Sequence, residues 1–418
     1  MTARVRVAQV VTKFVAGAGG ITLRGALALD PDRYAVTILA ADGGPLFAQA
    51  ELAGIDIIRL RHMSPTINPG EDVRGVRELV GHLGADRFDL VHSHSAKAGA
   101  IGRIAARRVG TPAIVHSFHG FPFHDFQSPA RRAAYIAIER WLGRFTDQFL
   151  TDGGAVAAEA VRLRIAPSER IRAIDSPVET NVPTVSPATR AHARRLLGIA
   201  PHVPVIGSVG RLDHQKAPED MVMAIAALGR PDVTMVWVGD GHLRTRVERR
   251  IAREGLAGRF VLLGERQDVP ALLPGLDVFA MSSLYEGLPC AVVEAMTCGV
   301  PVVATAVNSV PEVVVAGKTG LLVPTRDPAS LARALAYLLD HTEEAAQMAA
   351  EARLRLGGRF RAETLGRDLT AVYELALRRP AAMSPASLAS ATPASAPQAR
   401  GPTPPFTGRD NPRASWRP

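Results

Sequence analysis

Two carboxylates stand in an otherwise apolar stretch, YEGLPCAVVEAM, which covers residues 285–296. Between Glu286 and Glu294, residues Gly287 and Pro289 should bend the chain and begin a helix. Glu286 then lies just before the helix and Glu294 in its second turn, roughly two turns apart along the axis. This separation disfavours a shared proton. It favours two contacts with one extended ligand, such as the vicinal hydroxyls of a sugar or a ribose.

The alternative is that both acids are structural. Glu286 could cap the N-terminus of the helix, but a single cap does not explain Glu294 in so apolar a helix. The free N–H groups at the helix start, around Gly287 and Leu288, could bind the anionic part of the same ligand.

A basic loop, GRLDHQKAPED, follows a predicted strand and opens another helix. Arg211 offers a planar fork of donors and Lys216 a compact point charge, and together they suit a diphosphate. A solvated basic loop with no ligand is the other reading of this segment.

Histidines follow two predicted strands. In HSFHGFPFHDF, His116, His119 and His124 come after one strand, and we single out His119 as a group able to hydrogen-bond a hydroxyl or take a proton near neutral pH. Each could instead be a packed and satisfied polar group. His92 and His94 in VHSHS have no third ligand beside them, so they are weak evidence for a metal.

A glycine-containing loop, TKFVAGAGGITLRG, follows the first predicted strand. Gly17, Gly19 and Gly20 before a helix would let backbone N–H groups approach an anion. A tight strand–helix turn explains the same glycines equally well.

Two patterns that invite a metal or nucleotide site are rejected. VVVAGKTG lacks the first glycine of a phosphate loop, because Glu312 occupies that position. Asp30 and Asp32 form a D-x-D string where a helix should end, which indicates a turn. We therefore expect no metal and no tightly bound cofactor.

These residues need a scaffold that brings strand ends together. Apolar runs alternate with helical patterns in two series: VRVAQVV, YAVTILA, IDIIRL, FDLVHSH and PAIVHSF, then IGSVGRL, TMVWVGDG, RFVLLGE, LDVFAMSS and VPVVATAV. Such runs are typical of buried parallel strands with helical crossovers. They predict an α/β protein with two Rossmann-like, doubly wound parallel-sheet domains, and a ligand in the cleft between them.

Composition limits the class of protein. The 418 residues suit two domains, and the formal net charge of +9 indicates an anionic partner. Cys290 and Cys298 are read as buried small residues in a reducing compartment. No apolar run is long enough for a membrane span. We expect a cytoplasmic protein, with a peripheral position at the inner face of the cell membrane as the alternative.

The chain resembles the retaining glycosyltransferases of family 4, which have the GT-B fold. SSLYEGLPCAVVEAMTCGVPVVAT is similar to that family's E-x7-E signature, VGRLDHQKAPEDMVMAIAAL to its phosphate-binding loop and PEVVVAGKTGLLVP to the segment closing its donor pocket. HSHSAKAGAIGRIAARRVGTPAIVHSFHGFPF resembles bacterial members that build cell-surface glycans. The resemblance covers about residues 4–378.

The resemblance implies four segments. Residues 1–183 would form the N-terminal acceptor-side domain and 184–358 the C-terminal domain that binds the nucleotide sugar. Residues 359–379 would form a helix returning to the N-terminal domain. The Ala-, Pro- and Ser-rich residues 380–418 are predicted to be a disordered tail.

The resemblance also implies roles for individual residues. Arg211 and Lys216 would hold the donor diphosphate, Glu294 the ribose and Glu286 the hydroxyls of the transferred sugar. His119 would sit near the reacting sugar. Two further pairs of residues would line the pocket: Gly19 and Gly20 on the phosphate or acceptor side, and Gly264 and Arg266 beside the base.

This sequence departs from the family pattern in two places. Ser309 stands where members often carry a glycine, and TDGGAV stands where they have a serine-containing turn after the sixth strand.

The resulting expectation is a retaining enzyme that moves a hexose or N-acetylhexosamine from a nucleotide-diphosphate sugar, with UDP as the nucleotide, to a glycan or lipid-linked acceptor. A sugar-nucleotide epimerase or a phosphorylase on the same fold is one alternative. A non-catalytic basic binding protein is another, although aromatic residues, which nucleic-acid binders interleave with basic ones, make up only 5% of the chain.

Overall fold

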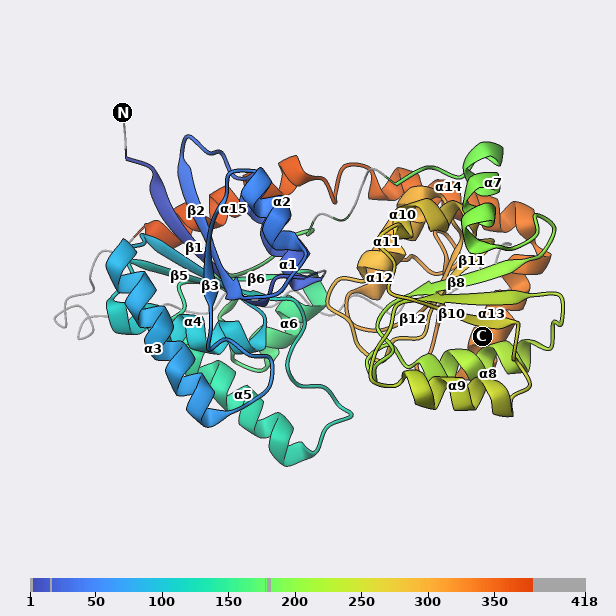
Figure 1. The fold of residues 1–418 in the computed structure, drawn as a ribbon, viewed down its shortest axis with the longest axis horizontal. Helices are drawn as coiled ribbons and strands as arrows, with labels where there is room; N and C mark the ends of the chain where they lie inside the picture. The colour runs from blue at the N-terminus through green and yellow to red at the C-terminus, as the bar shows by residue number, and fades with distance from the viewer. Residues whose placement is uncertain (1–2, 16, 177, 179–181, 379–418) are drawn as a thin grey trace, which may run out of the picture.

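The protein is described from a computed structural model that covers residues 3–15, 17–176, 178 and 182–378. Two α/β domains lie side by side, each built on one parallel sheet (Figure 1). This confirms the predicted fold class. The boundaries proposed from the sequence stay predictions, and the tail at 380–418 lies outside the described residues.

The first sheet has seven strands in the order β3-β2-β1-β4-β5-β6-β7. Its strands are β1 (Val5–Lys13), β2 (Tyr34–Ala41), β3 (Asp56–Leu60), β4 (Leu90–His94), β5 (Ala113–Phe118), β6 (Gln148–Thr151) and β7 (Ile171–Ala173). Its helices are α1 (Ala18–Ala28), α2 (Leu46–Leu52), α3 (Pro69–Asp86), α4 (Ala96–Val109), α5 (Pro129–Gly143) and α6 (Gly154–Arg162). The strand order reverses beside β1, so the ends of β1 and β4 diverge there and leave room for a ligand.

The second sheet has six strands in the order β10-β9-β8-β11-β12-β13. Its strands are β8 (Val205–Val209), β9 (Thr234–Val238), β10 (Phe260–Gly264), β11 (Val278–Met281), β12 (Val302–Thr305) and β13 (Leu321–Val323). Its helices are α7 (Pro187–Leu197), α8 (Pro218–Leu228), α9 (Arg244–Arg253), α10 (Val269–Leu272), α11 (Cys290–Cys298), α12 (Val310–Val313), α13 (Pro328–Asp340) and α14 (Thr342–Leu356).

Strands form because their side chains are buried on both faces of each sheet. Every residue of β4, β5 and β6 is buried, and separate apolar clusters cover the two faces of each sheet. The apolar spacing of residues 329–352 predicts one helical segment, but the structure has two helices there. α13 ends and α14 begins on either side of His341, whose φ of −116° and ψ of 63° are not helical.

The last helix, α15 (Ala362–Leu377), crosses from the second domain to the first and packs on α1, β5 and β6 (Figure 1). Tyr373 of α15 is fully buried against the first sheet. The crossing is secured by Arg359, whose guanidinium makes two 2.9 Å bonds with the carboxylate of Asp175 after β7. Removing this segment would uncover apolar surface of the first domain.

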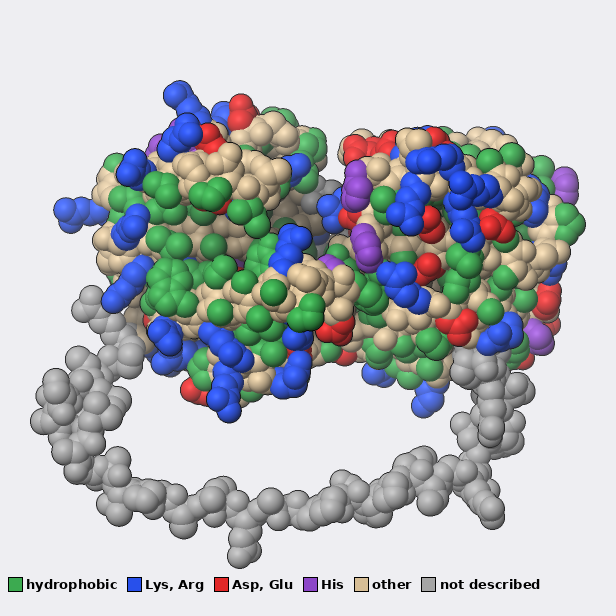
Figure 2. Space-filling model, turned by 90° about the horizontal axis from the view of Figure 1, so that it is seen from below, with side chains coloured by type: hydrophobic (Ala, Val, Ile, Leu, Met, Phe, Trp, Pro, Cys, Tyr) green, Lys and Arg blue, Asp and Glu red, His purple; other side chains and the backbone are tan. Residues whose placement is uncertain are grey.

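Charge is spread over both domains. On the face in Figure 2, Lys and Arg side chains occur on each domain among acidic and apolar ones. Within the described residues, no helix combines the length and the apolar character needed to cross a membrane.

Candidate active site

A cleft of about 550 Å³ lies between the domains at the carboxyl ends of the strands. The first domain contributes the loop after β5, with His119, and the start of α6. The second contributes the β11–α11 loop, with Glu286 and Gly287, and the segment after β12. Three residues predicted from the sequence therefore face the same cleft.

Glu286 is the centre of a polar cluster on the second domain. Its side chain is only 4% exposed, and its Oε1 lies 2.6 Å from the ammonium of Lys216. Gln215 Nε2 donates to Oε2 at 3.2 Å, and the backbone N–H of Glu286 donates to Asn308 Oδ1 at 2.8 Å. A buried carboxylate is stable here because charge and hydrogen bonds compensate its loss of water.

Arg211 does not join this cluster. Its side chain is 72% exposed and pairs with Asp213 at 2.9 Å. The structure thus shows Arg211 in an ion pair within its own loop, and a diphosphate role for Arg211 stays a prediction.

Gly287 allows the two domains to touch. A Cβ at this position would lie 2.5 Å from the carbonyl oxygen of His119 and 3.2 Å from the nitrogen of Gly120. Only a residue without a side chain fits there. Pro289 precedes α11 directly and takes the cap position, one place earlier than the first helical residue.

The other predicted residues on α11 are placed differently. Glu294 is partly buried in the second turn of the helix. Leu288 packs its side chain into the core of the second domain, so only its backbone could serve a ligand. Burial, together with the neighbouring Glu294 carboxylate, raises the pKa of the Cys290 thiol to about 12, so Cys290 is a thiol rather than a nucleophilic thiolate at neutral pH.

The predicted glycine loop is part of a helix. Gly19 and Gly20 lie in the first turn of α1 rather than before it. A Cβ on Gly19 would lie 2.9 Å from the carbonyl oxygen of Lys13, so close strand–helix packing accounts for this glycine. Gly20 has the guanidinium of Arg24 beside it.

The predicted base-side residues lie at the end of β10. Gly264 accepts a 2.8 Å bond from the N–H of Gly239, which ties the ends of β9 and β10 together. Arg266 makes two bonds to Asp268, which raises the pKa of the guanidinium. Neither residue is in the wall of the cleft around Glu286.

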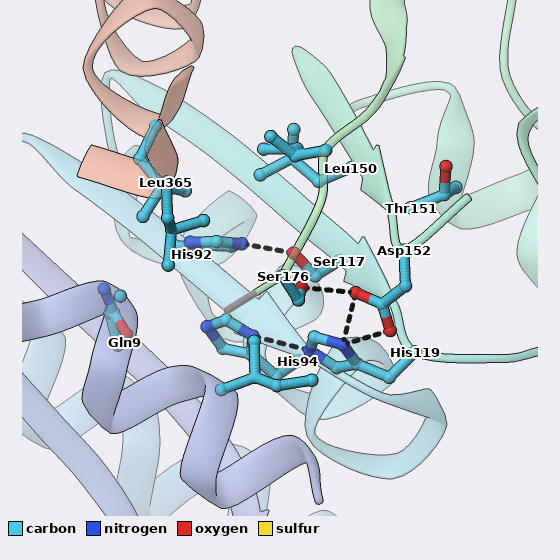
Figure 3. A pocket seen from close by; sticks show the side chains of 14 residues that line it. Gln9, His92, His94, Ser117, His119, Leu150, Thr151, Asp152, Ser176 and Leu365 are labelled. Atoms are coloured by element: carbon cyan, nitrogen blue, oxygen red, sulfur yellow. Dashed lines mark hydrogen bonds and ion pairs between the residues drawn. The ribbon is translucent and has the colours of Figure 1, made fainter. Parts of the chain in front are cut away.

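His119 lies in the cleft wall, and both nitrogens of its imidazole bond residues of the first domain. Nδ1 is 3.0 Å from Asp152 Oδ2, and Nε2 is 3.0 Å from His94 Nδ1 (Figure 3). The His94 and His119 rings are nearly parallel, 5.3 Å apart. The His92 ring bonds Ser117 and Tyr373 instead, and burial lowers the pKa of His92 to about 3.

Several residues of the site escaped the sequence analysis. Gln215 and Asn308 support Glu286, Asp152 supports His119, and Tyr285 stacks on His124 across the cleft at 4.4 Å. Tyr285 and Gln215 adjoin predicted residues, which is a usable signal. Asp152 lies in the TDGGAV segment and Asn308 adjoins Ser309, but those segments were noted only as departures from the family pattern and gave no role to either residue.

The described residues contain no group of three or more His, Cys, Asp or Glu side chains arranged to hold a metal ion. The expectation of a metal-free site stays a prediction.

Two family models match the chain, one on each domain. The model described as glycosyl transferase 4-like domain covers residues 16–176, and that described as glycosyl transferases group 1 covers residues 190–355. Among curated relatives, the 2-deoxystreptamine N-acetyl-D-glucosaminyltransferase of Streptomyces fradiae is 33% identical over 70% of this chain and 72% of its own length. The UDP-Gal:alpha-D-GlcNAc-diphosphoundecaprenol alpha-1,3-galactosyltransferase of Escherichia coli is 26% identical over 81% of this chain and 88% of its own.

Among solved structures, HepE of Anabaena in complex with UDP and glucose superposes with a TM-score of 0.77 at 23% identity, over 89% of this chain and all of that one. The fold is therefore GT-B. The chain belongs to the group 1 glycosyl transferases, and it is a family 4 glycosyltransferase.

Proposed function

We propose that this enzyme transfers a hexose or N-acetylhexosamine from a UDP sugar, with retention of the anomeric configuration, to a glycan or lipid-linked saccharide in the synthesis of cell-surface polysaccharide. The carrying observation is the buried Glu286–Lys216 pair, of which Glu286 lines the cleft together with the His119 loop. The names of the relatives support a UDP donor, an amino-sugar or hexose group and a lipid-diphosphate acceptor.

The proposed step needs positive charge on one side of the sugar and hydrogen-bond acceptors on the other. The bond from the anomeric carbon to the diphosphate breaks, and its electron pair leaves with the diphosphate. The acceptor oxygen bonds to the same face of that carbon, and its proton passes to the departing diphosphate. Lys216 and Arg211 stabilise the leaving charge, while Glu286 and Glu294 hold sugar and ribose hydroxyls.

The two catalytic assignments differ in what supports them. Lys216 already lies beside a buried carboxylate at the cleft, where a cation is worth more than in water. Arg211 stands on the same loop in solvent, and its part in the reaction requires the side chain to swing toward the diphosphate.

A panel of nucleotide sugars tests the proposal. We expect UDP sugars to raise the melting temperature more than GDP, ADP or dTDP sugars, and one of them to be consumed when a saccharide acceptor is present. Proton NMR of the product should show the anomeric configuration of the donor.

Each alternative has its own outcome in this panel. Turnover that needs inorganic phosphate and no nucleotide sugar would identify a phosphorylase. Conversion of the UDP sugar into the UDP derivative of its epimer, with the bond to UDP intact, would identify an epimerase. Binding of no nucleotide sugar under any condition would refute glycosyl transfer by this site.

A further inference from the structure

A small cavity of about 20 Å³ lies behind His119, inside the first domain (Figure 3). Gln9 of β1, His94 of β4 and Ser117 of β5 belong to its polar wall, and two leucines of α15, Leu365 and Leu369, close it on the apolar side. One water molecule needs about 10–15 Å³ and two or more polar partners. The cavity therefore has room for a single water.

One chain of hydrogen bonds follows the wall of this cavity and reaches the cleft at His119. Ser176 Oγ donates to Asp152 Oδ1 at 2.7 Å, Asp152 bonds His119 Nδ1, and His119 Nε2 bonds His94 Nδ1. An ionised carboxylate only accepts hydrogen bonds. The proton on His119 Nδ1 is therefore required by Asp152 in either charge state of the ring.

Two polar atoms at the inner end of the chain have no protein partner: His94 Nε2 and Gln9 Oε1. Both side chains line the cavity and are buried, with 3% and 1% exposure. In Figure 3 the unbonded ring nitrogen of His94 points toward Gln9. A buried polar atom without a partner costs free energy. One small polar ligand that hydrogen-bonds both atoms would remove this cost.

We propose that the cavity holds one ordered water bridging His94 Nε2 and Gln9 Oε1, and that Asp152 is the positioning residue that keeps the proton of His119 on Nδ1. The water donates to Gln9 and either donates to His94 Nε2 or accepts from it. It thus fits a neutral His119 that accepts from His94 and a charged His119 that donates to it. Burial keeps the pKa of His94 well below its ordinary value, so His94 itself stays neutral.

The consequence for the enzyme rests on the proposed function. His119 Nε2 is the ring atom whose proton can change, because Nδ1 is committed to Asp152. Replacing the carboxylate by an amide offers an N–H to Nδ1 and so favours the opposite tautomer.

The first test measures the tautomer directly. Nitrogen-15 NMR of the full chain labelled on histidine, with His119→Gln for assignment, should show the His119 proton on Nδ1. It should move to Nε2 in Asp152→Asn. The matched control is Asp147→Asn at the other end of β6, where the carboxylate caps the N–H of Ile114, and it should leave the His119 signals unchanged.

The second test separates positioning from folding. Asp152→Asn should lower kcat at least tenfold while the KM for the donor stays within about twofold, and Asp147→Asn should keep wild-type kcat. A wild-type His119 ring that is protonated on Nε2 and not on Nδ1, or full kcat in Asp152→Asn, would overturn the positioning role. If the wild type transfers no sugar yet shows the Nδ1 proton, the proposed function fails and the positioning stands.

The water is tested by a crystal structure at high resolution. Density for one water between His94 and Gln9 is expected in the wild type and not in Gln9→Met, which has similar volume and no oxygen. An empty cavity in the wild type overturns this part of the proposal.

Discussion

Lys216 and Glu286 neutralise each other before any ligand arrives. Their 2.6 Å contact is nearly buried, with 20% and 4% of the side chains exposed, and Gln215 completes the shell around the carboxylate. Removing one partner of such a pair leaves an uncompensated charge, at a cost of about 3–5 kcal/mol when burial is complete. A diphosphate near Lys216 would compete with Glu286 for the same ammonium, which links donor binding to the freedom of that carboxylate.

Lys216→Ala should therefore affect both stability and turnover. We expect kcat/KM to fall by roughly 10²- to 10³-fold, the usual effect of losing one group that stabilises developing charge, and the melting temperature to fall as well. The matched control is Arg253→Ala, an exposed cation of α9 in the same domain, which should change neither. Steady-state kinetics and thermal unfolding measure the two effects. Wild-type turnover in Lys216→Ala would show that this ammonium has no part in transfer.

The segments after β6 and β12 form the second contact between the domains. Glu312 of α12 accepts from the N–H groups of Gly154 and Ala155 at 2.8 and 2.7 Å, so its carboxylate caps α6 across the interface. Ser309, 1% exposed, lies against Gly153. A Cβ on Gly153 would be 2.0 Å from Ser309 Oγ.

The two departures from the family pattern thus meet at one point in space. A serine at position 153 would collide with Ser309, and a glycine at position 309 would make room for it. The two departures are therefore complementary: the Ser309 side chain fills the space that the glycine at position 153 leaves open.

Gly153→Ser alone should damage the interface, because inserting a side chain into a packed contact costs about 1–3 kcal/mol. We expect kcat/KM to fall about tenfold or more, and Gly153→Ser combined with Ser309→Gly to return within about threefold of the wild type. Gly81→Ser is the control, since a Cβ at that helix position contacts nothing within 4 Å. If the double variant is no better than Gly153→Ser, the compensation is wrong.

Three buried histidines beneath the cleft make the stability of the protein depend on pH. Burial is the largest cause of the lowered pKa of each: His92 to about 3, and His94 and His116 well below the ordinary value. Their positive neighbours lower these pKa values further, notably Arg103 beside His116. Between the folded and the unfolded pKa the unfolded chain binds more protons than the folded chain, so stability falls as pH falls below about 6.5.

We expect the free energy of unfolding to fall by about 1.4 kcal/mol per pH unit for each of these histidines as pH drops below 6.5. Urea unfolding followed by circular dichroism at pH 7.5, 6.5 and 5.5 measures it. In His92→Gln the free energy of unfolding should depend less steeply on pH. In the control His192→Gln, at an exposed position, it should depend on pH as in the wild type. Equal urea midpoints at all three pH values in the wild type would contradict the assignment.

Most strands of the fold could be predicted from the sequence. The ten apolar runs that predicted strands are strands, because a parallel strand buried on both faces must be a continuous run of apolar residues. The strands β6, β7 and β13 were not predicted, since segments of three or four residues carry little periodic signal. The break at His341 was also missed, because apolar spacing continues through it.

For the site, the sequence indicates which residues lie at strand ends, whereas the tertiary structure decides which of them are in contact. The sequence sufficed to place Glu286 and Lys216 at strand ends, because the residue types that follow a strand are local information. Which of them meet was decided by the folded chain: Lys216 bonds a carboxylate 70 positions away, Asp152 faces a histidine 33 positions before it, and Glu312 caps a helix 158 positions before it. Such partners come together only when two sheets and their connecting helix pack, and no spacing along the chain encodes that geometry.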